Sequence, residues 1–400
     1  MREHTDSELS GDRKQALNQA AKPIVIATML REAGATGVQT HVTQLCRYLA
    51  AAGVENFLVT PFSWARPLTY PAFSVRFLLN IVSNSAGVTW YRFGHELFLY
   101  RALIRRLSSL DDCVVYAQGP LEARAALRAR RGPHQRVVMV VHYKTSQADE
   151  WVDRKETPIK RGGRTYQRIR RDERETIPRV DGLVSVSEWA RQAVLEWLPE
   201  AAHVPSAVIV NFTEPMVPEP NPESLADIVT TGSIEQVKNH TYLLDILAEA
   251  NRRGHRYTLD IFGQGMLINE LQEKARDLGL ADQIRWRGFR PDVRNFLPGY
   301  RAYAHASYSE SSSLAIIEAM AAGLPILAGK IGGVQELFDD GVEGRFWPLD
   351  NVSRATDMLI ELLDSEDGRR TAGQAARKRY FCSYDSTVVA PRLLEFLQEE

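Results

Sequence analysis

The chain has 400 residues, of which 44% are hydrophobic and 25% are charged, and this describes a folded globular protein with room for two domains. The formal net charge of −1 gives no overall attraction to nucleic acid, so no nucleic-acid partner is expected. The three cysteines, Cys46, Cys113 and Cys382, are far apart and lack metal-ligand spacing. They fit free thiols in a reducing cytoplasm, which is the location we expect.

Residues 1–22 are polar and contain no apolar run that could serve as a signal peptide, so we expect a flexible tail. The continuous apolar run PIVIATML begins at Pro23 and predicts a buried parallel strand. A glycine-containing turn then leads into a helix with one apolar face, which ends at Gly53. Strand, turn and helix open a doubly wound α/β domain, in which ligands lie at the carboxyl ends of the strands.

The alternation of strands and helices continues to residue 212, which predicts a first Rossmann-like domain over residues 23–212. The proline-rich run PMVPEPNPESL then predicts an interdomain linker over residues 213–225. The alternation restarts in residues 226–377, a second Rossmann-like domain, and a final helix over residues 378–400 is expected to cross back to the first. The predicted fold class is α/β, with two doubly wound domains facing a cleft. Further strands of the first domain are expected at residues 56–60, 113–117, 137–141, 183–186 and 207–210.

Two segments of the first half are rich in arginine. Residues 73–110 combine aromatic side chains with several arginines, which indicates either a core helix with a solvated basic face or a basic, aromatic surface on a membrane. Residues 160–174 indicate either a solvated helix with i,i+4 ion pairs or a surface for an anionic acceptor or lipid headgroups. Both alternatives stay open at this stage, so a peripheral contact at the inner face of a membrane is a hypothesis.

The most informative stretch is SYSESSSLAIIEAMAAGLPILAGKIGGVQELFDDGVEG, beginning at Ser307. A helix should begin after its serine run and end at Gly323, because serine favours the N-cap and glycine the C′ position. Glu318 is the sole charged residue of this otherwise apolar helix, and a buried carboxylate needs a partner. Glu310 stands just before the helix N-terminus, where free N–H groups and the helix dipole favour phosphate. The structural alternative is that Glu310 caps the helix and Glu318 pairs with an arginine.

Two glutamates eight residues apart, followed by EAMAAGLPILA, GG and Glu336, resemble the signature of the retaining GT-B glycosyltransferases of family 4. The resemblance implies that Glu310 lies beside the donor sugar and that Glu318 binds the ribose hydroxyls. It also implies that the loop and helix N-terminus at Ser313 and Leu314 hold the diphosphate. On the same resemblance, the first domain binds the acceptor and the second domain binds the nucleotide sugar.

Weaker motifs match the same family in the same order. The string GATGVQTHV resembles its N-terminal loop, which implies that Gly37 approaches the diphosphate and that Gln39 faces the acceptor, while Thr36 replaces the first glycine. His142 ends the strand VVMVV, and a histidine there is as compatible with a structural role as with a functional one. The resemblance implies that His142 contacts the acceptor or the donor sugar.

The phosphate-binding loop of the second domain is expected in TTGSIEQVKN, where Gly232 ends a strand and Lys238 follows after a short loop. Ser233 occupies the place of a family arginine, so one expected cation is missing. Gly263 belongs to a turn of the form GxG. Arg290 lies where family members hold the base through the backbone.

The resulting hypothesis is a retaining transferase that moves a hexose from a nucleoside-diphosphate sugar, with a UDP-sugar ahead of a GDP-sugar. Its acceptor would be a hydroxyl of a saccharide, a lipid-linked or a small molecule, in the synthesis of glycans, glycolipids or glycosylated metabolites. The expected catalytic residues are Glu310, Lys238 and His142. No D-x-D motif occurs, so neither a metal nor another cofactor is expected. The alternatives are a sugar-nucleotide epimerase of the same architecture and a non-catalytic sugar-binding protein.

Overall fold

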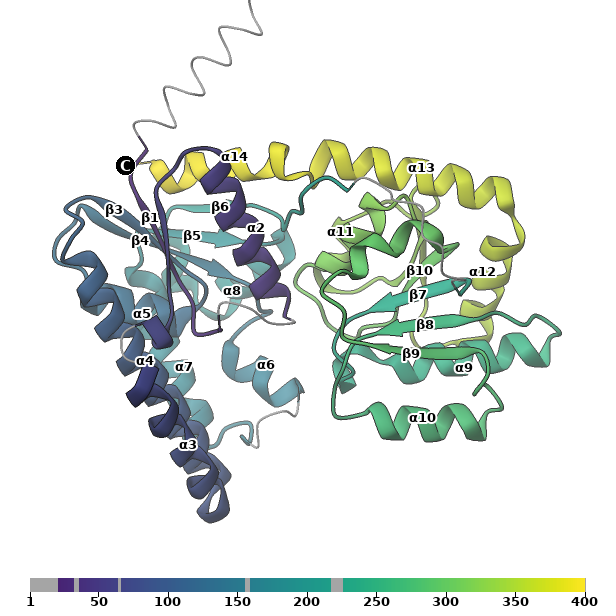
Figure 1. The fold of residues 1–400 in the computed structure, drawn as a ribbon, viewed down its shortest axis with the longest axis horizontal. Helices are drawn as coiled ribbons and strands as arrows, with labels where there is room; N and C mark the ends of the chain where they lie inside the picture. The colour runs from purple at the N-terminus through teal and green to yellow at the C-terminus, as the bar shows by residue number, and fades with distance from the viewer. Residues whose placement is uncertain (1–20, 32–35, 64–65, 155–158, 217–225, 400) are drawn as a thin grey trace, which may run out of the picture.

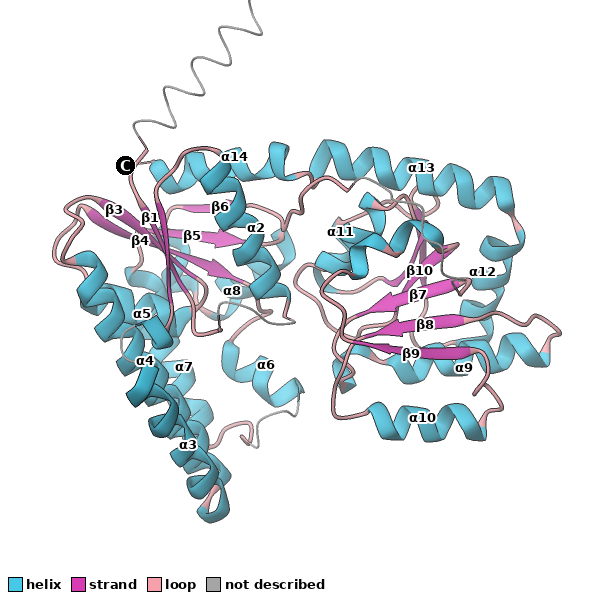
Figure 2. Ribbon diagram, in the orientation of Figure 1, coloured by secondary structure: helices cyan, strands magenta, loops and turns pink. Residues whose placement is uncertain are grey.

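The computed structural model describes residues 21–31, 36–63, 66–154, 159–216 and 226–399, and shows two α/β domains side by side (Figure 1). Within these residues each domain contains one six-stranded sheet, and every strand pair is parallel (Figure 2). Helices cover both faces of each sheet, so the inner strands of each sheet are almost entirely buried, as their continuous apolar sequences predict. The predicted α/β fold with two doubly wound domains is confirmed.

The first sheet has the strand order β2-β1-β3-β4-β5-β6. Because the order reverses beside β1, the loops that follow β1 and β3 diverge and leave a crevice at the carboxyl edge. The strands are β1 (Ile24–Ala27), β2 (Asn56–Val59), β3 (Cys113–Ala117), β4 (Gln135–Val141), β5 (Gly182–Ser185) and β6 (Ser206–Val208).

The second sheet has the order β12-β11-β10-β7-β8-β9, and here the reversal lies between β7 and β10. The loops after these two strands contain Gly232 and Glu310, so the topology alone brings these residues of the predicted site to one place. The strands are β7 (Ile228–Thr231), β8 (Leu259–Phe262), β9 (Ile284–Gly288), β10 (Ala302–His305), β11 (Ile326–Gly329) and β12 (Gly344–Trp347).

Helices of the first domain pack in two layers. One apolar core joins α4 and α5 to one face of the sheet, and another joins α2 and α14 to the opposite face. The helices are α2 (Gly37–Ala51), α3 (Arg66–Val82), α4 (Asn84–Leu107), α5 (Pro120–Ala129), α6 (Gln147–Arg154), α7 (Arg164–Thr176) and α8 (Glu188–Trp197).

Helices of the second domain also pack in two layers. Helices α9, α10 and α12 share one core with the sheet, and α11 and α13 share the other. The helices are α9 (His240–Arg252), α10 (Ile268–Asp277), α11 (Leu314–Ala321), α12 (Val352–Asp364), α13 (Glu366–Ser383) and α14 (Ser386–Gln398), the last of which crosses to the first domain.

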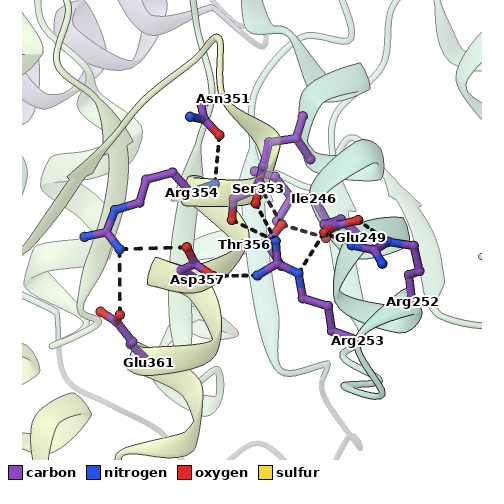
Figure 3. A network of polar contacts seen from close by, with 11 residues as sticks. Ile246, Glu249, Arg252, Arg253, Asn351, Ser353, Arg354, Thr356, Asp357 and Glu361 are labelled. Atoms are coloured by element: carbon purple, nitrogen blue, oxygen red, sulfur yellow. Dashed lines mark hydrogen bonds and ion pairs between the residues drawn. The ribbon is translucent and has the colours of Figure 1, made fainter.

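A polar network joins α9 to α12 on the outer side of the second domain (Figure 3). The Arg253 guanidinium lies 2.7 Å from Glu249 and 2.5 Å from Asp357, and donates to the Ser353 hydroxyl at 2.7 Å. Beneath it, the Thr356 hydroxyl donates to the Ile246 carbonyl at 3.4 Å. Since exposed ion pairs are individually weak, the network fixes the orientation of the two helices more than it adds to stability.

The predicted boundary between residues 377 and 378 falls inside α13 and is wrong. Helix α13 continues to Ser383 because Ala376 and Tyr380 are buried in the second domain. The helix ends at its C-cap, Tyr384, and Asp385 caps the next helix, α14, which crosses to the first domain (Figure 1). Of the predicted linker, residues 217–225 lie outside the described part of the chain.

Residues 73–110 form two antiparallel helices, α3 and α4, instead of the single core helix that was one alternative. Ser83 ends the first and caps the second, and its hydroxyl accepts from the Ala86 amide at 3.4 Å. Arg92 is buried, where it donates to Gln147 at 2.6 Å, so it belongs to neither a solvated nor a lipid-facing surface. The expected basic face is therefore smaller than the sequence indicates.

Candidate functional site

Glu310 follows β10 and lies at the centre of a polar cluster. The Lys238 ammonium lies 2.5 Å from its Oε1, the Ser307 hydroxyl donates to the same oxygen at 3.0 Å, and His305 Nε2 lies 3.5 Å away. Burial favours the neutral carboxyl, but Lys238 and His305 outweigh it and hold the pKa of Glu310 well below its usual range. Glu310 is therefore an ionised carboxylate, which can orient a substrate but cannot donate a proton.

The loop that contains Glu310 needs glycine at two neighbouring positions. Gly332 has a φ of +47°, and an added Cβ would lie 2.1 Å from the carbonyl oxygen of Glu310. A Cβ on Gly333 would lie 1.9 Å from the carbonyl oxygen of Ser311, and the Gly333 amide donates to Glu310 at 2.9 Å. The pair of glycines in the signature thus supports the backbone of the catalytic candidate.

Lys238 is placed by a short 3₁₀ turn, Gln236–Lys238, and by an unusual residue after it. Asn239 has a φ of +51° and is the one non-glycine residue with positive φ in the described chain. Its buried Nδ2 has no partner there, and neither has Nδ1 of His240 beside it. Strained backbone and unpaired polar atoms gather at functional sites, so Asn239 and His240 join the candidates. Sequence reasoning missed both, although the run KNH was visible.

The N-terminus of α11 faces the first domain. Ser313 caps the helix and accepts from the Ile316 amide at 3.4 Å, as the serine run predicts. An ideal Cβ on Gly37, the first residue of α2, would lie 3.7 Å from Cδ1 of Leu314. The amino ends of α2 and α11 therefore meet across the domain boundary, and both carry unpaired N–H groups and positive dipole ends.

Glu318 lies inside α11 and is nearly buried. Its Oε1 lies 3.7 Å from Nε of Arg294, which is an ion pair without a hydrogen bond. Burial raises the pKa of Glu318 to about 7, and Arg294 opposes that rise only in part. An arginine partner exists, as the structural alternative proposed, yet the contact is too long to satisfy the carboxylate.

We expect replacement of Glu318 by glutamine to remove one pH dependence of stability. Between pH 4.5 and about 7 the folded protein keeps a proton on Glu318 that the unfolded chain has released. Stability should therefore fall as pH rises through this window, by at most about 1.4 kcal/mol per pH unit. Glu318→Gln should remove this contribution to the pH dependence of stability. The measurement is the difference in the free energy of unfolding between the two proteins, obtained by urea unfolding from pH 5 to 8. If the free energy of unfolding changes with pH in the same way in both proteins, the assigned pKa is contradicted.

Arg290 and Lys330, two other cations close to glycine turns of the second domain, have other partners. Arg290 forms a two-point ion pair with Asp292, at 3.0 and 2.8 Å, and stacks on Phe296. Lys330 lies over the ring of Phe346, 5.9 Å from its centre. Ser233, which occupies the place of a family arginine and carries no charge, follows Gly232, whose φ is +148°. The expected cation Lys238, by contrast, contacts Glu310 directly.

The glycines around Lys238 allow two strand ends to touch. Gly263 has a φ of +153°, and its added Cβ would lie 1.8 Å from the carbonyl oxygen of Gly232. In the same turn a Cβ on Gly265 would lie 2.2 Å from the carbonyl oxygen of Ile234. The GxG turn is therefore a steric requirement of the loop that carries Lys238.

On the first domain, the two predicted acceptor residues lie in different settings. Gln39 belongs to the capping box of α2, where it exchanges hydrogen bonds with Thr36. Its Nε2 donates to the carbonyl of Arg31 at 2.9 Å. His142 follows β4, and its Nε2 lies 3.2 Å from Oε1 of Gln118.

A buried aromatic and polar cluster surrounds His142 and was missed from the sequence. The ring of His41 lies 5.3 Å from that of His142, and neither nitrogen of His41 has a partner in the described chain. Burial lowers the pKa of His41 to about 4 and, with His41 adding to the effect, that of His142 to about 3. Both rings are neutral at neutral pH, so they can exchange hydrogen bonds with hydroxyl groups but carry no charge. His41 is the histidine of GATGVQTHV, so the string that resembles the family's N-terminal loop already contained it.

Glu336 joins the two domains beside this site. Its carboxylate accepts from the amides of Glu188 and Trp189 at 2.9 and 2.7 Å, at the N-terminus of α8. Gly333 packs against Ser187, the cap of that helix. A carboxylate is favoured at this position because the helix dipole is positive there.

The described residues contain no cluster of three or more histidine, cysteine, aspartate or glutamate side chains arranged to hold a metal ion. The N-termini of α2 and α11 meet near Lys238 and the ionised Glu310. N–H groups at helix N-termini and a lysine cation are groups that favour a phosphorylated ligand.

Comparison with known proteins defines the class. Residues 35–213 match the profile described as Glycosyltransferase Family 4, and residues 212–379 match the profile described as Glycosyl transferases group 1. Solved GT-B glycosyltransferases share the two-domain fold. The chain therefore belongs to the GT-B glycosyltransferases of group 1, and the family resemblance is confirmed.

Two curated relatives illustrate the range of the family. The phosphatidyl-myo-inositol mannosyltransferase of Mycolicibacterium smegmatis is 27% identical over 368 residues, which are 90% of this chain and 89% of that protein. The GtfA subunit of the UDP-N-acetylglucosamine–peptide N-acetylglucosaminyltransferase of Streptococcus gordonii is 29% identical over 163 residues. That match covers 40% of this chain and 31% of the subunit.

Two solved structures show the same fold at 16% identity. Sucrose-phosphate synthase from Thermosynechococcus elongatus has a TM-score of 0.73, covering 94% of this chain and 98% of that one. HepE of Anabaena, in complex with UDP and glucose, has a TM-score of 0.69, covering 94% and 99%.

Proposed function

We propose that the protein is a retaining hexosyltransferase that uses a nucleoside-diphosphate sugar, with UDP as the preferred nucleotide. The observation that carries the proposal is the meeting of the α2 and α11 N-termini at Gly37 and Leu314, beside the Lys238–Glu310 pair. A departing diphosphate needs preorganised N–H groups and a cation, and this arrangement supplies both. The complexes of HepE with UDP support UDP as the nucleotide.

In the proposed reaction the bond between the anomeric carbon and the diphosphate breaks as the acceptor oxygen bonds to the same face of that carbon. The acceptor proton passes to the leaving phosphate oxygen, so no protein base is required. Glu310 orients the sugar, Lys238 and the N–H groups near Ser313 neutralise the leaving group, and Glu318 binds the ribose. Gly232, Ser233, Gly263 and Arg290 form the surrounding donor loops.

The acceptor is proposed to bind on the first domain, between Gln39 and His142. Neutral His142 and His41 suit a hydroxyl acceptor, because a neutral imidazole both donates and accepts hydrogen bonds. The acceptor is a saccharide, a lipid-linked molecule or a small molecule. A lipid-linked acceptor has the support of the Mycolicibacterium relative, whose name specifies a phosphatidyl-myo-inositol substrate.

The proposed reaction is tested by its nucleotide, metal and stereochemical requirements. Calorimetry with UDP, GDP and ADP should give the tightest binding for UDP, and Glu318→Ala should weaken it by about 1–3 kcal/mol while the protein stays folded. EDTA should leave turnover essentially unchanged, because we expect no metal to bridge the diphosphate. An α-linked donor should give an α-linked product by NMR.

Each alternative has a distinct outcome in these experiments. A strict requirement for manganese or a β-linked product would refute the metal-independent, retaining mechanism. Turnover of the nucleotide sugar without an acceptor would favour an epimerase. Tight sugar binding without turnover would favour a sugar-binding protein.

A further inference from the structure

The helical hairpin of α3 and α4 carries an apolar surface that the proposed reaction does not use. Figure 1 shows the two helices projecting away from the first sheet. Near the end of α3, Phe77, Leu78 and Ile81 are 73%, 66% and 83% exposed, and Phe93 of α4 is 50% exposed. Large side chains gathered at this exposure mark an interaction site.

Contacts between α3 and α4, and between α4 and α7, hold the hairpin together. Trp90 Nε1 of α4 donates to the Ala72 carbonyl of α3 at 2.8 Å. The ring of Phe73 stacks on His95 with 4.0 Å between centres. A hydrogen bond of 2.6 Å between the hydroxyls of Ser85 and Thr165 joins α4 to α7.

An open groove of about 480 Å³ lies between the hairpin and α7. Leu79, Trp90 and Phe93 form an apolar wall, and Arg164 and Arg168 of α7 line the groove with them. Arg171 follows at the next helical spacing, and the three arginines are exposed. The groove therefore combines apolar surface with positive charge.

Three other arginines near this groove have carboxylate partners. Arg161 and Arg170 lie 2.6 and 2.7 Å from Asp149, and Arg124 lies 2.6 Å from Asp172. In the described chain no carboxylate pairs with Arg164, Arg168 or Arg171, so the i,i+4 pairing considered from the sequence is not what they form. Their charge remains available to an anionic ligand.

We propose that the end of the α3–α4 hairpin and the arginine face of α7 dock on a membrane of anionic phospholipid. Phe77, Leu78 and Ile81 would enter the interfacial region, and lipid phosphates would bind at Arg164 and Arg168. The overall charge of −1 does not attract such a membrane, so the attraction comes from this local surface. No helix in the described ranges is long and apolar enough to span a bilayer. The inference concerns binding and does not rest on the proposed reaction.

Sedimentation with vesicles tests the proposal without donor or acceptor. The purified full chain should bind vesicles of phosphatidylcholine that contain about 30 mol% phosphatidylglycerol, which gives an anionic surface. It should bind vesicles of pure phosphatidylcholine at least roughly tenfold more weakly. Binding should also weaken as salt rises from about 0.05 to about 0.5 M, because screening reduces the attraction between surface charges.

Two double variants separate the charged and the apolar contributions. Arg164→Gln with Arg168→Gln, and Phe77→Ser with Ile81→Ser, should each lower the vesicle affinity by about tenfold or more. The matched control, Arg276→Gln with Lys378→Gln, removes two exposed cations of the second domain and should change the affinity less than about twofold. Unchanged melting temperature and UDP affinity would show that each variant is folded.

Three results would overturn the proposal. The first is an unmodified protein that stays in the supernatant with anionic vesicles at low salt. The second is vesicle binding that survives both double variants. The third is a dimer that Phe77→Ser with Ile81→Ser dissociates, without any vesicle binding, because the apolar surface would then belong to a contact between copies.

Discussion

Replacement of Lys238 by alanine is expected to lower turnover at saturating donor by at least about 10²-fold. Removing one preorganised charge donor costs about that much in comparable sites, and Ser233 cannot supply the missing charge. The structure adds a second reason, since Lys238 is the nearest cation to the buried Glu310 carboxylate. Without it the pKa of Glu310 should rise. Steady-state kinetics with saturating donor measures the effect.

Three comparisons sharpen the Lys238 experiment. Lys238→Arg keeps the charge and should retain more activity than Lys238→Ala, and Ser233→Arg should leave turnover unchanged or raise it. Lys274→Ala is the control, because this lysine of α10 pairs with Asp245 of α9. If Lys238→Ala changes only the apparent donor affinity, another cation neutralises the leaving group, and Arg290 or Lys330 would be tested next.

Replacement of Gly263 by alanine is expected to destabilise the protein and disrupt the donor site together. The new Cβ would lie 1.8 Å from the carbonyl oxygen of Gly232, so the ends of β7 and β8 must separate. Steric overpacking and a left-handed φ together should cost about 2–4 kcal/mol. Thermal unfolding and UDP calorimetry measure the two effects, and UDP affinity should fall by about tenfold or more, because Gly232 leads into the loop of Lys238.

Gly279→Ala is the matched control for this variant. Gly279 has a φ of +69°, but no atom lies within 4 Å of its added Cβ. It should therefore cost only the backbone strain, about 1 kcal/mol, and leave UDP affinity unchanged. Equal destabilisation by the two substitutions would show that the contact with Gly232 relaxes without consequence.

The elements that the sequence predicted well are those with strong local signals. Helix α11 begins after Ser313 and ends before Gly323, because a serine cap and a left-handed glycine act within a few residues of the helix ends. The two sheets could be predicted because apolar runs alternate with helical segments along the chain. The break at Ser83 was missed because aromatic residues continue on both sides of it, although serine there is a good N-cap.

The contacts of the site were harder to predict because they join residues that are distant in the chain. Lys238 and Glu310 are 72 residues apart, and Glu336 reaches an amide 148 residues away. Contacts between residues so far apart in the chain leave no local sequence pattern. The family resemblance therefore indicated the residues but not which of them pair. The left-handed backbone conformation of Asn239 could not be predicted either, because asparagine adopts this conformation only in certain contexts.

Helix α14 has a consequence for how the protein is made. Its Leu393 and Leu397 are fully buried in the core formed by α2 and the first sheet. Domains commonly fold in turn as the chain leaves the ribosome. Here the domain synthesised first lacks part of its core until α14 has been translated, so its apolar surface has to be shielded while the second domain is still being made.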